Sequence, residues 1–140
     1  MNTKNVLLTV GLLGLAWNIF GTYQFIVSVN ATSESLIAMG MSEAQAMVMT
    51  KYPLWMTVSF AIGVFGGLIG SILLLLKKAI SEKIFLASLL GYIVLYIGDI
   101  TEGIFEAIGK SQVIVLTTVV IIAFGLWFFA RAYRRKGILN

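Results

Sequence analysis

Three carboxyl side chains at helical spacing are the part of this sequence best suited to chemistry. Asp99, Glu102 and Glu106 lie three and four residues apart in an otherwise apolar run, so at about 100° per residue they share one face of a helix. Tyr92 falls on the same side. Carboxyl groups within a membrane usually face a bundle interior or a water-filled cavity, and they mark ion pathways and proton relays. The pattern therefore predicts a binding path for a small cation, a proton or a polar solute along these four residues.

The first apolar run carries a neutral polar group, Asn18, with Thr22 one turn later. An amide within a membrane needs a hydrogen-bond partner, so this face is expected to look into the protein, where Asn18 and Tyr92 would complete the polar lining. Two plainer interpretations stay open. Asn18 can serve only to join helices, and residues 99–109 can form a helical extension outside the membrane, with its acids in water.

The residue types that are missing narrow the chemistry further. The 140 residues include no cysteine and no histidine, which removes thiolate sites, the commonest metal ligand and the usual general base near neutral pH. We therefore expect no enzyme, no cofactor and no metal site. Capture of a soft metal ion by two methionine pairs is an alternative to a structural role for them, because thioethers suit Cu(I). The pairs are Met39 with Met41 and Met47 with Met49.

The composition indicates the kind of protein that must position these groups. It is 59% hydrophobic and 11% charged, whereas soluble domains average about 45–50% and about 25%. A helix needs about 20 apolar residues to cross a bilayer, and the chain contains four such runs. We predict a single all-α membrane domain over 1–140, built as a four-transmembrane-helix bundle. The predicted spans are 6–29, 53–76, 84–108 and 113–130.

The segment 31–52, between the first two spans, contains its own helix signal. Ser42 followed by Gln45 matches a capping box, which predicts a short helix over 43–51 on the outer side. Aromatic residues near the span ends, Tyr52 and Trp55 among them, fit an interfacial aromatic belt.

Basic residues predict the orientation in the membrane. Most of them flank the same ends of the predicted spans, whereas only Lys51 and Lys110 lie on the other side. The positive-inside rule therefore predicts cytoplasmic termini (N-in, C-in) in the inner (plasma) membrane. The net charge of +4 then reflects contact with anionic lipid headgroups and not with nucleic acid. The basic residues on the predicted cytoplasmic side are Lys4, Lys77, Lys78, Lys83, Arg131, Arg134, Arg135 and Lys136.

Four glycines in the second span form two small-xxx-small pairs, Gly63 with Gly67 and Gly66 with Gly70. Such pairs let another helix approach closely. We expect them to pack helices within the bundle. The alternative is a self-association face, since four helices alone bury little interior, and a homo-oligomer is therefore expected.

Part of the chain resembles a known family. The motif Tyr52-Pro53-Leu54-Trp55, the run SFAIGVFGGLIG at 59–70 and the later Ser88-Leu89-Leu90-Gly91 are similar to a family of small four-helix bacterial membrane proteins often labelled "sugar transporter". The resemblance implies four membrane spans and a place in the bacterial inner membrane. It supplies no binding residues, and the acidic residues 99–106 lie outside its pattern.

The working hypothesis from the sequence is a small transport or channel protein that uses the acidic face of the third span. The alternative is a non-catalytic accessory or structural subunit of a larger membrane complex, in which a basic patch on a partner meets the acids. Binding of a neutral, lipid-like ligand is also open. An intramembrane enzyme is disfavoured because no nucleophile–base pair is recognisable.

Overall fold

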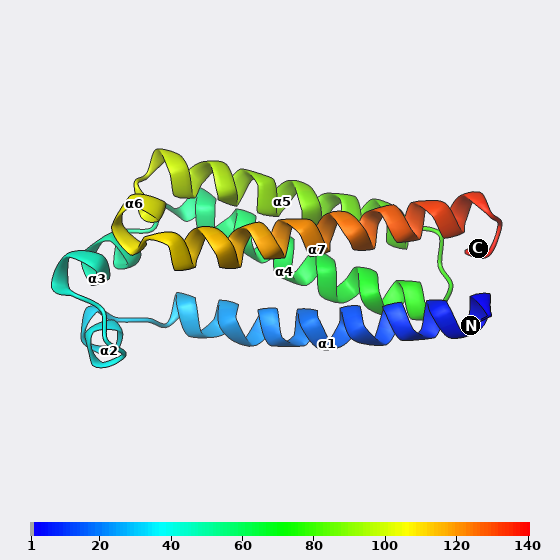
Figure 1. Ribbon diagram of the computed structural model, residues 1–140, viewed down its shortest axis with the longest axis horizontal. Helices are drawn as coiled ribbons and strands as arrows, with labels where there is room; N and C mark the ends of the chain where they lie inside the picture. The colour runs from blue at the N-terminus through cyan, green and yellow to red at the C-terminus, as the bar shows by residue number, and fades with distance from the viewer. Residues whose placement is uncertain (1) are drawn as a thin grey trace.

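The computed structural model describes residues 2–140, which form helices and no strand. Four of the helices are long and apolar enough to cross a membrane, as expected of a multi-pass membrane protein. The helices, labelled in Figure 1, are α1 (Thr3–Val29), α2 (Ser33–Ala38), α3 (Glu43–Thr50), α4 (Leu54–Leu75), α5 (Ser81–Thr101), α6 (Ile104–Ile108) and α7 (Lys110–Arg135).

The four long helices run alongside one another along the length of the molecule (Figure 1). α4 packs against α1 and against α5, and α5 packs in turn against α7. The two ends of the chain lie at one end of the molecule, and the short helices α2, α3 and α6 cover the other end. α1 and α7 thus each pack mainly against one other long helix, α1 against α4 and α7 against α5.

Charge divides between the two ends of the molecule. Eight of the ten lysines and arginines lie at the end that holds the termini, which we call the basic end; the remaining two are Lys51 and Lys110. Five of the six acidic residues belong to the opposite end, which we call the acidic end. The sixth, Glu82, forms an ion pair with Arg134. The five acids of the acidic end are Glu34, Glu43, Asp99, Glu102 and Glu106.

The short helix predicted from the capping box is confirmed as α3. Gln45 N–H donates to Ser42 Oγ, and Ser42 N–H donates to Gln45 Oε1, each over 3.1 Å. A second capping box, Thr32 with Ser35, starts α2, which the sequence analysis did not predict.

The third predicted span is not one continuous helix over 84–108. α5 ends at Thr101, and Gly103 adopts a left-handed backbone conformation with φ of 73°. Glycine accepts this conformation without the steric cost of a Cβ, so it ends the helix. The chain then turns into α6. The face that was expected to carry three carboxyl groups in a row is therefore interrupted after Asp99.

The glycines of α4 lie against other helices of the same chain. A Cβ at Gly63 would come within 2.7 Å of the Tyr92 ring, and one at Gly70 within 2.7 Å of the Phe85 ring, both on α5. Gly66 lies against Ser88 of α5. Gly67 instead lies against the amide of Asn18 on α1, where a Cβ would clash with Oδ1. These small residues let α4 approach α1 and α5 at the same time.

Candidate functional site

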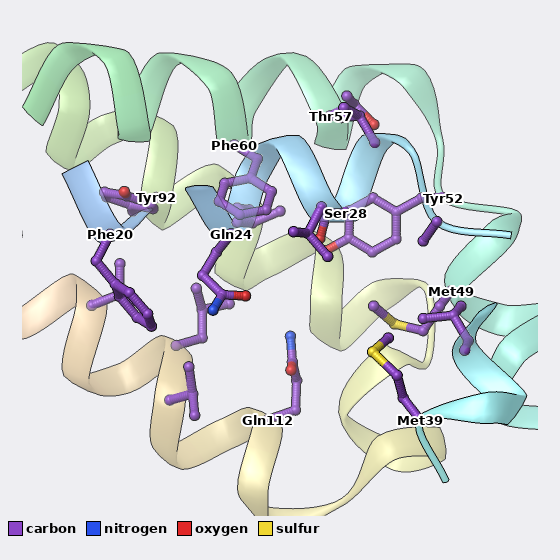
Figure 2. Close-up of a pocket in the computed structure, with 18 of the residues that line it drawn as sticks. Phe20, Gln24, Ser28, Met39, Met49, Tyr52, Thr57, Phe60, Tyr92 and Gln112 are labelled. Carbon is purple, nitrogen blue, oxygen red and sulfur yellow. The ribbon is translucent and has the colours of Figure 1, made fainter. Parts of the chain in front are cut away.

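A pocket of about 540 Å³ lies between α1 and α7 near the acidic end, backed by α4 and α5 (Figure 2). Nearer the basic end these two helices are in contact, because the side chain of Leu126 on α7 packs directly on Gly14 of α1. Farther along, the residues of α1 from Trp17 onward face residues 112–119 of α7 across the pocket. The pocket thus opens between these two helices on the side toward the acidic end.

The pocket walls are mainly apolar and aromatic. Trp17 and Phe20 come from α1, Phe60 from α4, and Leu95 from α5. Three methionines, Met39, Met41 and Met49, line the end that lies under α2 and α3. Because a thioether side chain is flexible and polarisable, these methionines provide an adaptable apolar wall.

A few polar side chains interrupt this apolar lining. Gln24 of α1 and Gln112 of α7 point into the space from opposite sides, and Tyr52 reaches it from the segment before α4 (Figure 2). Ser28 and Thr57 add hydroxyl groups. A small-molecule site typically combines apolar walls with a few placed polar groups, and this pocket has that composition.

A buried carboxyl group organises two of these polar residues. Asp99, in the last turn of α5, is 0% exposed. Tyr52 Oη donates a 2.7 Å hydrogen bond to Asp99 Oδ1, and Gln112 Nε2 donates a 3.1 Å hydrogen bond to Oδ2. Among residues 2–140, no lysine or arginine forms an ion pair with Asp99. Asp99 thus lies directly behind two side chains that line the pocket.

Local sequence explains how three distant segments meet here. The turn at Gly103 reverses the chain after α5, so that α7 starts at Lys110 and presents Gln112 in its first turn. Tyr52 precedes Pro53, which caps α4 in an extended conformation. Gln45 Nε2 donates to the carbonyl of Ala107 over 3.1 Å, which holds α3 against α6.

Tyr52 is a neutral donor in this arrangement. Burial raises its pKa well above the ordinary value of about 10, and the charge of Asp99 and the hydrogen bond to it raise that pKa further. The hydroxyl therefore keeps its proton over the physiological range, and the bond to Asp99 is maintained.

The structure brings together only some of the residues singled out in the sequence. Tyr92 is 5% exposed and lines the pocket. Asp99 does not line the pocket itself but is bonded to Tyr52 and Gln112, which do. Glu102 and Glu106 are exposed and do not join Asp99. Asn18 is 3% exposed; its Nδ2 donates to the carbonyl of Gly14 and lies 3.5 Å from the hydroxyl of Ser71 on α4. Asn18 thus links α1 to α4.

The sequence analysis missed the glutamines and the partner of one tyrosine. Gln24 and Gln112 are amides within or beside apolar runs, and the argument applied to Asn18, that such a group needs a partner, applies equally to them. Tyr52 was interpreted as part of an interfacial belt, but its hydroxyl is turned to Asp99. Nothing in the local sequence indicates that partner, because it lies 47 residues away.

Comparison of the chain with protein-family models, with curated proteins and with solved structures gave no match.

Proposed function

We propose that this chain is a four-span membrane protein that binds a small, mainly apolar molecule in the pocket between α1 and α7. The observation that supports this most directly is the pocket itself, with about 540 Å³ of space and a largely apolar lining. That volume falls within the range of about 300–1,000 Å³ typical of small-molecule sites. Apolar walls favour a ligand that dissolves in lipid over a hydrated ion.

The rim of the pocket favours entry from the bilayer. Phe20 on α1 is 53% exposed and Val115 on α7 is 59% exposed, and both line the pocket. Exposed apolar side chains on membrane helices face lipid tails, so the opening between these helices would connect the pocket to the hydrocarbon region. A ligand dissolved in the membrane would then reach the pocket without crossing water.

The orientation follows from the charges. The basic end would lie in the cytoplasm under the positive-inside rule, giving cytoplasmic termini in the plasma (inner) membrane. The pocket lies nearer the acidic end, so the ligand would occupy the outer half of the bilayer. Asp99 would lie at the depth where the spanning part of α5 ends.

A second candidate is the transport of a proton or a small cation. It is favoured by Asp99, a fully buried carboxyl group with two neutral donors. Two observations count against transport and favour ligand binding. Glu102 and Glu106 are exposed. Among the described residues, the narrow gap lined by Asn18 and Tyr92 has no room for a water molecule.

Native mass spectrometry of the protein extracted in mild detergent tests the proposal. We expect a small molecule to co-purify with the protein. Val115→Trp would fill the pocket mouth, so this variant should lose the bound mass. Ile121→Trp is the matched control, because Ile121 lies on the same helix and is 64% exposed but does not line the pocket. Equal retention by both variants, or no bound mass in the native protein, would contradict ligand binding in this pocket.

A further inference from the structure

We infer that the ligand of the α1–α7 pocket is a lipophilic amine, with an apolar body in the pocket and a protonated amino head against Tyr52 and Gln112. This inference rests on the proposed binding function and adds the chemical class of the ligand. It follows from the hydrogen-bond polarity of the pocket, from the charge behind it and from its aromatic walls.

The first step concerns hydrogen-bond polarity. Tyr52 has one O–H, and Asp99 accepts it. Gln112 turns its amide nitrogen toward the other oxygen of Asp99, so its amide oxygen is turned away from Asp99. The Tyr52 hydroxyl therefore has only its lone pairs left for a ligand, and Gln112 offers its amide oxygen as an acceptor beside one remaining N–H. Acceptors of this kind pair with a head group that donates hydrogen bonds, such as an amine or a hydroxyl.

The second step concerns charge. A cation leaves water at a large free-energy cost unless an opposite charge lies near it. Asp99 is hydrogen-bonded to two side chains that line the pocket, and within residues 2–140 no basic side chain pairs with it. A protonated amine would supply the missing positive charge, whereas an anionic head group would be repelled. The other acids of the acidic end would also attract cations to this side of the molecule.

The third step concerns the walls. Trp17, Phe20 and Phe60 line the pocket together with the ring of Tyr52. Aromatic rings attract a cation through their faces and also bury apolar surface, so one set of side chains suits both parts of a lipophilic amine. The methionines at the end of the pocket would adapt to differences in the shape of the apolar body.

Three probes that share a phenylpropyl group separate these effects: 4-phenylbutylamine, 4-phenyl-1-butanol and 5-phenyl-2-pentanone. Their heads are a charged donor, a neutral donor and an acceptor. Binding is measured by calorimetry with the full chain in nanodiscs of zwitterionic lipid, and empty nanodiscs correct for partitioning. We expect the amine to bind about tenfold more tightly than the ketone, with the alcohol between them, since one charge-assisted hydrogen bond accounts for a difference of that size.

Two variants and a control assign the preference to the Asp99 network. Asp99→Asn should reduce the amine-over-ketone ratio to about threefold or less. Gln112→Met, which removes an acceptor and keeps Asp99, should also lower it, and provides the test should Asp99→Asn fail to fold. Glu102→Gln removes an exposed charge near Asp99 in sequence and should leave the ratio unchanged, with melting temperature as the check on folding.

The outcomes separate this inference from the proposed function. If all three probes bind equally, or the alcohol or ketone binds more tightly than the amine, the amine assignment is overturned while the pocket still binds ligands. If Glu102→Gln lowers the ratio as much as Asp99→Asn, general surface charge explains the preference and the assignment is again overturned. If none of the probes binds the native protein, and native mass spectrometry also finds no bound species, the binding function itself is overturned.

Discussion

The hydroxyl of Tyr52 donates a 2.7 Å hydrogen bond to Oδ1 of Asp99, across 47 residues of sequence. Tyr52 belongs to the short connection between α3 and α4, whereas Asp99 lies in the last turn of α5. The bond therefore joins the connection between α3 and α4 to the end of α5. With Gln112 on the second oxygen of Asp99, one buried carboxyl group fixes the position of two pocket residues from different segments.

Removing the acceptors of Asp99 should destabilise the protein. Asp99→Leu leaves the Tyr52 hydroxyl and the Gln112 amide without their partner in a buried site, so we expect a loss of about 2–4 kcal/mol. Asp99→Asn should cost less, because an amide can still accept one of the two hydrogen bonds. The measurement is the unfolding free energy from denaturant titration in detergent micelles. Glu102→Gln, at an exposed position, should change it by less than about 0.5 kcal/mol, and an equally stable Asp99→Leu would show that the network contributes nothing.

Much of the helical framework was predictable, because apolar run length and capping chemistry are local properties. The four long helices start and end within a few residues of the predicted spans, apart from the third, and the capping box at Ser42 located α3 correctly. The third helix is shorter than predicted, because α5 ends at Thr101, just before Gly103. A glycine inside an apolar run can continue a helix or end it, and only the packing around it decides between these outcomes.

The candidate site was less predictable than the framework. The sequence identified Asp99 and Tyr92 from their types and spacing, but spacing on one helix cannot reveal a partner on another. The bonds from Tyr52 and Gln112 depend on the turn at Gly103 and on how α3 and α4 meet. The pocket is lined by both α1 and α7, and no local pattern encodes how two helices at opposite ends of a chain are placed relative to each other.

The close approach of α4 to α1 should make Gly67 intolerant of a side chain. A Cβ at this position would clash with Asn18 Oδ1, so Gly67→Ala should cost about 1–3 kcal/mol through overpacking. Gly125→Ala is the matched control on α7, where nothing lies within 4 Å of an added Cβ. It should be neutral or stabilising by up to about 1 kcal/mol, because alanine favours the helix.

A double-mutant cycle tests the contact itself. Asn18→Ala alone loses the hydrogen bond to Gly14 and should be destabilising. Combined with Gly67→Ala, it also removes the clash, so the double variant should lose less stability than the sum of the two single losses. Simple additivity would show that Gly67 and Asn18 do not interact. Thermal unfolding in detergent gives all four stabilities in one set of measurements.

Alkaline pH should weaken the protein through Tyr52. Burial and Asp99 raise the pKa of Tyr52 in the folded state, so the folded protein holds this proton more tightly than the unfolded chain does. The resulting stabilisation is complete below the unfolded pKa of about 10, and it is lost as the pH rises from there toward the folded value. The fall in melting temperature between pH 8 and pH 11 should therefore be smaller in Tyr52→Phe than in the native protein. Equal falls would mean that Tyr52 does not contribute, since the remaining tyrosines and lysines are common to both proteins.

The membrane orientation can be tested with single cysteines, because the chain has none of its own. Each cysteine must be placed at an exposed position, because a buried cysteine fails to react on either side of the membrane. Ser81, the first residue of α5 at the basic end, is 0% exposed and is therefore unsuitable. Lys78 in the same region is exposed, as are Ala44 on α3 and Ser111 at the start of α7.

With the basic end in the cytoplasm, a membrane-impermeant maleimide added to intact cells should label Ala44→Cys and Ser111→Cys but not Lys78→Cys. Permeabilised cells are the control, in which all three variants should react. Labelling of Lys78→Cys in intact cells, with protection of the other two, would reverse the orientation and place the pocket in the cytoplasmic half of the bilayer.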